Sequence, residues 1–201
     1  MTPLEDWLQP ASIEFAVYTP GDLERVSGLS GEMQRVWRRR GHLPSPDSGH
    51  ARFTGLEVLE ITIRTALSKA GIPPSETEID LTSATKAAMY YAVFSHGAVE
   101  VIGPTSKVDH FLNVFEENGE LGLRLVGNPP ASPFFVMNDK RESRIVDNAD
   151  DLILDHEELN LVYNLRSLGE RLVERGRKPI IVVTWPNESN ERFKRRLTNL
   201  I

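Results

Sequence analysis

The chain has 201 residues, of which 40% are hydrophobic and 26% are charged, and its formal net charge at pH 7 is −6. This composition is ordinary for a folded protein with a sizeable core, and it is too apolar for a chain that stays disordered. The sequence has no cysteine, which excludes disulfides, thiolate catalysis and cysteine-based zinc sites. The net acidity argues against a protein that coats nucleic acid over its whole surface, but it leaves room for a local basic face.

The amino-terminal stretch MTPLEDWLQP is acidic and lacks the basic start and the apolar core of a signal peptide. No run of about 18 apolar residues occurs elsewhere in the chain. We therefore expect a cytoplasmic protein, associated with the nucleoid, that makes no membrane contact.

Two short helices are predicted in succession after residue 18. Thr19, followed by proline, caps the first helix, and Gly28 ends it. Ser30 caps the second, which runs from Gly31 to Arg40 and stops at Gly41. Only a few residues, one of them glycine, separate the two helices, and this spacing is typical of a helix-turn-helix motif.

Prolines and glycine exclude a helix over residues 44–49, while His42-Leu43 and Ala51-Arg52-Phe53 are predicted to pair as a small β-hairpin. Thr54 is predicted to cap a third helix, whose apolar residues keep helical spacing up to Gly71. The Pro-Pro-Ser-Glu stretch at residues 73–76 indicates a boundary, with one domain over residues 1–77 and a second over residues 78–201.

In the second half of the chain, segments with helical periodicity alternate with segments that have a strand pattern. Helices are predicted over residues 83–96, 107–119, 156–176 and 188–201. Strands are predicted over residues 98–103, 120–127, 132–139, 143–148 and 178–185. These patterns indicate a mixed domain with helices packed on a sheet of about five strands.

Four arginines and one glutamate lie between residues 31 and 44. On a helix, Arg35, Arg38 and Arg39 form one stripe at positions i, i+3 and i+4, with Gln34 beside it. Three like charges on one stripe repel one another, and an anionic ligand would remove that penalty. DNA is such a ligand, because arginine recognises guanine or holds phosphate and glutamine recognises adenine. The alternative is a solvated helix face without a ligand. The apolar residues of the helix, predicted to pack against the first helix, are Met33, Val36 and Trp37.

The stretch YTPGDLERVSGLSGEMQRVWRRRGHLPSPDSGHARFTGLEVLEI, near a quarter of the chain, resembles the winged helix-turn-helix of the MerR superfamily, including its excisionase-like members. The matching features are the tyrosine-led first helix, the Gly28-Leu29-Ser30 turn, the arginines and tryptophan of the second helix, and Gly49-His50-Ala51-Arg52-Phe53 as the wing. Arg38 stands where the family often has glutamate, and Gln34 stands where it often has leucine. The long dimerisation coil of the family is replaced here by the second domain.

The resemblance implies that Arg35 and its neighbours enter the major groove while Arg52 of the wing holds the backbone. The fold class is therefore predicted to be α+β, with a winged helix-turn-helix, mainly α with a small hairpin wing, followed by a mixed α/β domain. The residues predicted to contact DNA are Tyr18, Thr19, Ser30, Gln34, Arg35, Arg38, Arg39, Arg40, His50 and Arg52.

Three roles stay open for the second domain: oligomerisation, sensing of a small molecule, and docking of another protein such as RNA polymerase. A single winged module offers a small interface, which favours oligomerisation as part of the role. The candidate oligomer surface is a leucine stripe, and the alternative is that this stripe packs on the sheet. Its residues are Leu161, Leu165, Leu168 and Leu172. The basic run over residues 192–196 is predicted either to add phosphate contacts or to be a solvated helix face.

No glycine-rich phosphate loop, nucleophile elbow or metal-ligand motif is present in the sequence. We therefore predict neither an enzyme nor a bound cofactor or metal. The predicted function is that of a sequence-specific, DNA-binding transcriptional regulator of bacterial or phage type. Its predicted partners are double-stranded DNA and further copies of the chain, in a homodimer or a higher homo-oligomer. The alternatives are an excisionase-like architectural protein of recombination and a protein-interaction adaptor.

Overall fold

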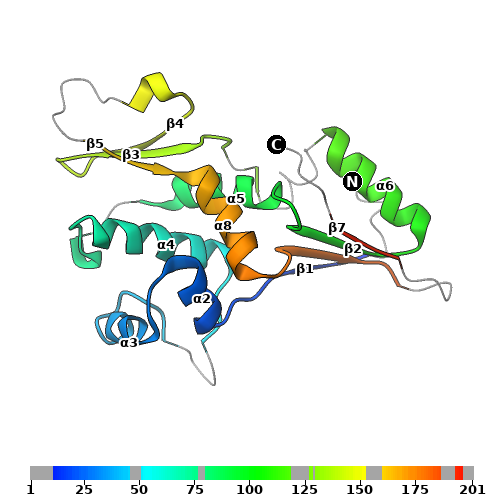
Figure 1. Ribbon diagram of the computed structural model, residues 1–201, viewed down its shortest axis with the longest axis horizontal. Coiled ribbons are helices and arrows are strands. Elements are labelled where there is room, and N and C mark those ends of the chain that lie inside the picture. Colours follow the sequence, from blue (N-terminus) through cyan, green and yellow to red (C-terminus); the bar gives the residue numbers. More distant parts are fainter. Residues whose placement is uncertain are drawn as a thin grey trace.

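The computed structural model describes residues 11–45, 51–76, 80–118, 127–128, 130–152, 160–186 and 193–196. Over these residues the chain is a mixed α and β protein (Figure 1). The α-helices are α2 (Pro20–Ser27), α3 (Gly31–Arg39), α4 (Gly55–Lys69), α5 (Thr82–Val93), α6 (Thr105–Asn118) and α8 (Leu165–Gly176). Two short 3₁₀ helices are η1 (Pro74–Glu76) and η2 (Ala149–Leu152). None of the described helices has the length and apolar character needed to cross a membrane.

Two sheets are present in the described part of the chain. The first has the strand order β1-β6-β2-β7, with β6 parallel to β2 and the outer two strands antiparallel to their neighbours. Its strands are β1 (Ser12–Phe15), β2 (Val99–Gly103), β6 (Ile181–Thr184) and β7 (Phe193–Arg196). The second sheet is antiparallel, in the order β4-β3-β5. Its strands are β3 (Phe134–Asn138), β4 (Ser143–Val146) and β5 (Asn160–Asn164).

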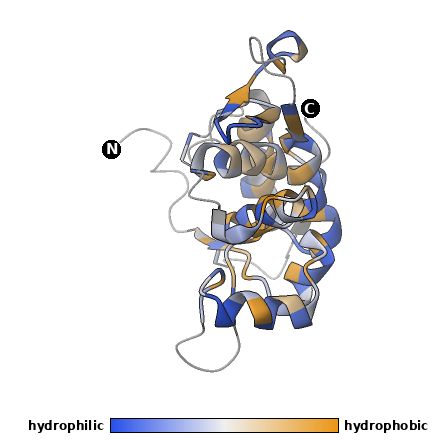
Figure 2. Ribbon diagram, turned by 90° about the vertical axis from the view of Figure 1, so that its left-hand side faces the viewer, coloured by the Kyte–Doolittle hydropathy of each residue, from blue (hydrophilic) through white to orange (hydrophobic). Residues whose placement is uncertain are grey.

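The two sheets lie at separate places around the central helices. In Figure 1, α8 crosses in front of α5, the three-stranded sheet lies above them, and α2 and α3 lie below. The four-stranded sheet is on the right with α6. Hydrophilic and hydrophobic residues alternate along the helical ribbons in Figure 2, as expected where one face of a helix packs in the core and the other meets solvent.

The structure confirms the three helices predicted before residue 71. They could be predicted because their caps are strong local signals. Thr19 begins α2 and Thr54 begins α4, each with a capping box in which the threonine side chain and an acidic side chain three residues later satisfy backbone N–H groups. Gly28 ends α2 in the left-handed conformation, with φ +72°, which glycine adopts without steric cost.

The predicted helix over residues 156–176 is wrong in its first part. Residues 160–164 form β5, which pairs with β3, and α8 begins only at Leu165. Asn164 accepts a hydrogen bond from the N–H of Ser167 and so caps α8. Residues 153–159 lie outside the described part.

Other segments of the chain also differ from the prediction or lie outside the described residues. The helix predicted over residues 188–201 is wrong where the chain is described, because residues 193–196 form β7 beside β2. The strand over residues 12–15 was not anticipated, and the strand predicted over residues 120–127 lies almost entirely outside the described residues. Phe53, predicted to pair with His42-Leu43 in a hairpin, instead forms an isolated antiparallel bridge with Tyr18, in which each residue donates its backbone N–H to the carbonyl oxygen of the other.

One hydrophobic core crosses the predicted boundary at residue 77. It joins residues of α2 and α4 to residues of α5, α8 and the four-stranded sheet, and β1 from the first part pairs with β6 from the second. The leucine stripe belongs to this core: Leu165, Leu168 and Leu172 are fully buried. These three leucines are therefore not an oligomer surface. They lie on α8, which packs chiefly against α5 and not on the sheet that the alternative named, and Leu161 lies in β5, half-buried.

Candidate nucleic-acid interface

The helices α2 and α3 are joined by the Gly28-Leu29-Ser30 turn, which is held on both sides. Ser30 caps α3 by accepting a hydrogen bond from the N–H of Met33 at 3.3 Å. Leu29 and Trp37 are buried in the core, 4% and 3% exposed. Because the turn and the tryptophan fix one side of α3, its opposite side is presented outward in a set orientation.

Gln34 lies on the buried side of α3, and the prediction that it contacts a base is wrong. The residue is 1% exposed, and its Nε2 donates hydrogen bonds to the carbonyl oxygens of Pro20 at 3.0 Å and Leu29 at 2.9 Å. These bonds tie α3 to the start of α2 and to the turn. Gln34 lies three positions before the buried Trp37, on the same side of a helix, and this spacing could have indicated its role.

The arginines of α3 and its end form an exposed basic face, as predicted. Arg35, Arg39 and Arg40 are exposed and Arg38 is half-buried, and none of the four forms an ion pair with a described residue. An open hollow of about 520 Å³ lies along this face, lined by Glu32, Arg35, Val36, Arg38 and Arg39. With three guanidinium groups against one carboxylate, the hollow favours an anion.

Arg38 is the most constrained of these arginines. Its guanidinium carbon lies 6.0 Å from the centre of the Phe53 ring, a cation–π distance. The Nε and Nη2 atoms are buried and have no hydrogen-bond partner among the described residues. Since Phe53 lies two residues before α4, this contact joins the approach to α4 to the basic face.

Of the two residues predicted to contact DNA at the start of α2, Tyr18 and Thr19, the prediction for Tyr18 is corrected. Tyr18 is fully buried, with its ring 5.1 Å from the Lys178 Nζ atom, so its side chain is not available to DNA. Burial and then the charge of Asp22 raise the pKa of Tyr18. Thr19 is half-buried and is occupied as the cap of α2.

The residues predicted for the wing are only partly described by the structure. Arg52 is exposed, and its one described hydrogen bond goes to the neighbouring carbonyl of Ala51 at 3.4 Å. His50 lies outside the described residues. Met33, predicted to pack against α2, is 43% exposed instead, and so it stands at the border of the basic face.

A buried carboxylate, which sequence reasoning missed, fastens α2 to α8. Asp22 is 5% exposed; its Oδ2 accepts hydrogen bonds from the Lys178 Nζ and the Thr19 N–H, both at 2.8 Å, and its Oδ1 pairs with Arg25. Burial on its own would raise the pKa of Asp22, but the bonds from Lys178 and Thr19 hold the pKa well below its usual value. The Thr-x-x-Asp spacing could have identified Asp22, whereas Lys178 is 156 positions away and gave no local signal.

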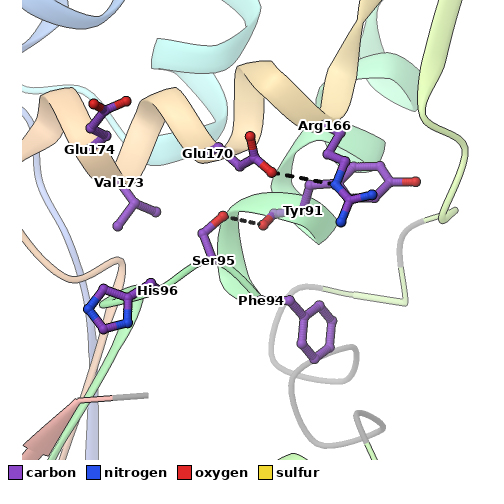
Figure 3. A pocket seen from close by; sticks show the side chains of 8 residues that line it. All are labelled: Tyr91, Phe94, Ser95, His96, Arg166, Glu170, Val173 and Glu174. Atoms are coloured by element: carbon purple, nitrogen blue, oxygen red, sulfur yellow. Dashed lines mark hydrogen bonds and ion pairs between the residues drawn. The ribbon is translucent and has the colours of Figure 1, made fainter. Parts of the chain in front are cut away.

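A second hollow, of about 500 Å³, lies between α5 and α8 (Figure 3). Two polar contacts join residues of its lining: Arg166 pairs with Glu170 at 3.4 Å, and the Ser95 hydroxyl donates to the carbonyl of Tyr91 at 2.7 Å. Arg166 also lies over the Tyr91 ring at 5.9 Å. The arginine of this hollow is paired with a carboxylate, whereas the arginines of α3 form no ion pair with a described residue. The basic face of α3 is therefore the stronger candidate site.

The sequence of this chain matches no family model, no curated protein and no solved structure.

Proposed function

We propose that the protein binds double-stranded DNA and regulates transcription, with α2 and α3 as a helix-turn-helix and α3 in the major groove. The observation that carries this proposal is the stripe of Arg35, Arg38 and Arg39, which has no ion-pair partner among the described residues. A stripe of unpaired guanidinium groups on one helix face matches the charge of the duplex and the acceptor atoms of guanine.

The packing of α3 supports the same proposal. A recognition helix must be held rigidly, and here Trp37 and the two hydrogen bonds of Gln34 hold the buried side. Arg52, which the resemblance assigns to the wing, is exposed. The resemblance to the MerR superfamily supports a role in transcription.

The test is to select bound fragments from random duplex DNA and to measure affinity for the enriched sequence by fluorescence anisotropy. Arg35→Ala and Arg39→Ala are each expected to weaken specific binding by about 1–3 kcal/mol. Arg52→Ala is expected to weaken binding to all sequences and to lower the salt dependence by a slope of about one, because a wing arginine holds phosphate.

The matched control is Arg144→Ala, which removes the same charge from β4, an exposed strand outside the helix-turn-helix. Its affinity for the enriched sequence should equal that of the wild type. Wild-type protein that binds no duplex at low ionic strength, or Arg35→Ala and Arg39→Ala variants with wild-type affinity, would rule out the proposed interface.

A further inference from the structure

A separate cluster of arginines lies where the end of α8 meets α2. A hollow of about 320 Å³ is lined by Arg25, Glu174, Arg175 and Arg177. The Nε of Arg25 donates to the carbonyl oxygen of Arg175 at 3.2 Å, which joins two elements that are 150 positions apart in the chain. The hollow shares no residue with the one along α3.

The charges around this hollow do not cancel. Arg25 pairs with Asp22, and the same carboxylate also binds Lys178. Arg175 and Arg177 are exposed and form no ion pair with a described residue, which leaves Glu174 as the one carboxylate in the lining. In a chain of net charge −6, this convergence of guanidinium groups favours an anion.

Arg177 stands at a backbone position that disfavours it. The residue ends α8 with φ +57°, in the left-handed region where glycine is the usual residue and a side chain costs stability. A basic residue in the last turn of the helix would stabilise the helix dipole without that strain, and Arg175 already occupies the last turn. The dipole therefore does not explain why an arginine occupies position 177.

We infer that this hollow binds a phosphate of the DNA backbone, outside the stretch of duplex that α3 covers. The inference rests on the proposed function, and it adds the junction of α2 and α8 to the DNA-binding surface. Arg175 and Arg177 bind the phosphate oxygens, and Arg25 is positioned beside them by its bond to the Arg175 carbonyl. The second half of the chain thereby contacts the same duplex as the basic face.

The decisive variant is Arg177→Gly, because glycine relieves the backbone strain while it removes the guanidinium group. Its Tm should equal or exceed that of the wild type, so that any loss of DNA binding is not a loss of folding. The matched control is Arg141→Gly, which removes the same charge at φ +69° in the turn between β3 and β4.

Affinity is measured against salt concentration on two duplexes centred on the enriched sequence, one of roughly 10 bp and one of roughly 30 bp, or about one and three helical turns. On the longer duplex, Arg177→Gly is expected to bind more weakly and to lower the slope of log K against log salt by about 0.9, the value for one phosphate contact. On the shorter duplex it should match the wild type, and Arg141→Gly should match the wild type on both.

Four results would overturn the inference, the last of them together with the proposed function. Arg177→Gly could keep wild-type affinity and slope on the longer duplex, or it could lose as much on the shorter one. The wild type could instead bind inorganic phosphate in a titration, and lose it on Arg177→Gly, while DNA affinity is unchanged; the site would then serve a free phosphate. If Arg35→Ala weakens binding and Arg177→Gly does not, this inference fails and the proposed function stands. If the wild type binds no duplex, both fail.

Discussion

Asp22 stabilises the start of α2 and also binds the segment that follows α8. One carboxylate closes the capping box with Thr19 and also receives Lys178 from beyond α8. Because its folded-state pKa lies below its unfolded-state value, the ionised form contributes stability that is fully present above about pH 5 and is lost as the pH falls below about 4.

Asp22→Asn is therefore expected to lower the free energy of unfolding by about 2 kcal/mol at pH 7, since it weakens charge-assisted hydrogen bonds at a buried site. The difference from the wild type should shrink as the pH falls towards 3, because the carboxyl of the unfolded wild type then takes up a proton while the folded carboxyl stays ionised. Urea unfolding at a series of pH values measures both effects. Glu24→Gln, an exposed change on the same helix, is the control, and a difference that stayed constant with pH would contradict the account.

At the scale of elements, the close approach of α5 and α8 depends on Gly169. A Cβ atom at this position would lie 2.4 Å from the Ala88 carbonyl oxygen and 2.6 Å from the Ala92 nitrogen. These atoms belong to the backbone of α5, so they cannot move aside as a flexible side chain would.

Gly169→Ala should therefore force the two helices apart and destabilise the protein by about 1–3 kcal/mol, a typical cost of overpacking. Gly21→Ala in α2 is the contrasting variant. Its Cβ would meet no atom closer than 3.8 Å, and alanine in a helix is favoured over glycine by about 0.5–1 kcal/mol. Thermal unfolding of the two variants should shift Tm in opposite directions, and equal shifts would show that the helix contact is not set by this glycine.

The sequence predicts an element well where its own residues decide the structure. The caps Thr19, Ser30 and Thr54 and the glycine at position 28 are local, and α2, α3 and α4 were predicted from them. The strands β5 and β7 were predicted as helix because their strand conformation depends on pairing with β3 and β2, which are distant in sequence.

The same distinction applies to the candidate site. Helical spacing alone predicted that Arg35, Arg38 and Arg39 share a face, and the structure places them along one hollow. Helical spacing did not predict the burial of Gln34 and Tyr18, because the burial of a side chain is decided by the elements that pack on it. The arginines of the α2–α8 junction were missed for the same reason, since no local pattern relates Arg25 to Arg177.

At the scale of the whole molecule, the continuous core ties the basic face to the rest of the chain. β1 pairs with β6, Tyr18 packs beside Gly176 at the end of α8, and Asp22 binds Lys178. A chain held together by such contacts should unfold as one unit, because loss of either half exposes the buried surface of the other.

Two tryptophans test this cooperativity, because each reports on a different region. Trp37 lies in α3 and Trp185 follows β6, and they are 3% and 4% exposed. Two single-tryptophan variants, each with the other two tryptophans replaced by phenylalanine, should show a large fluorescence change on unfolding, because water reaches a buried indole. Each fluorescence curve is compared with the far-ultraviolet circular dichroism of the same variant, so that a difference in overall stability between the variants does not affect the comparison. We expect the midpoints to coincide within each variant. A Trp37 transition at lower urea than the helix signal would show instead that α2 and α3 unfold separately, as an independent domain over residues 1–77 would.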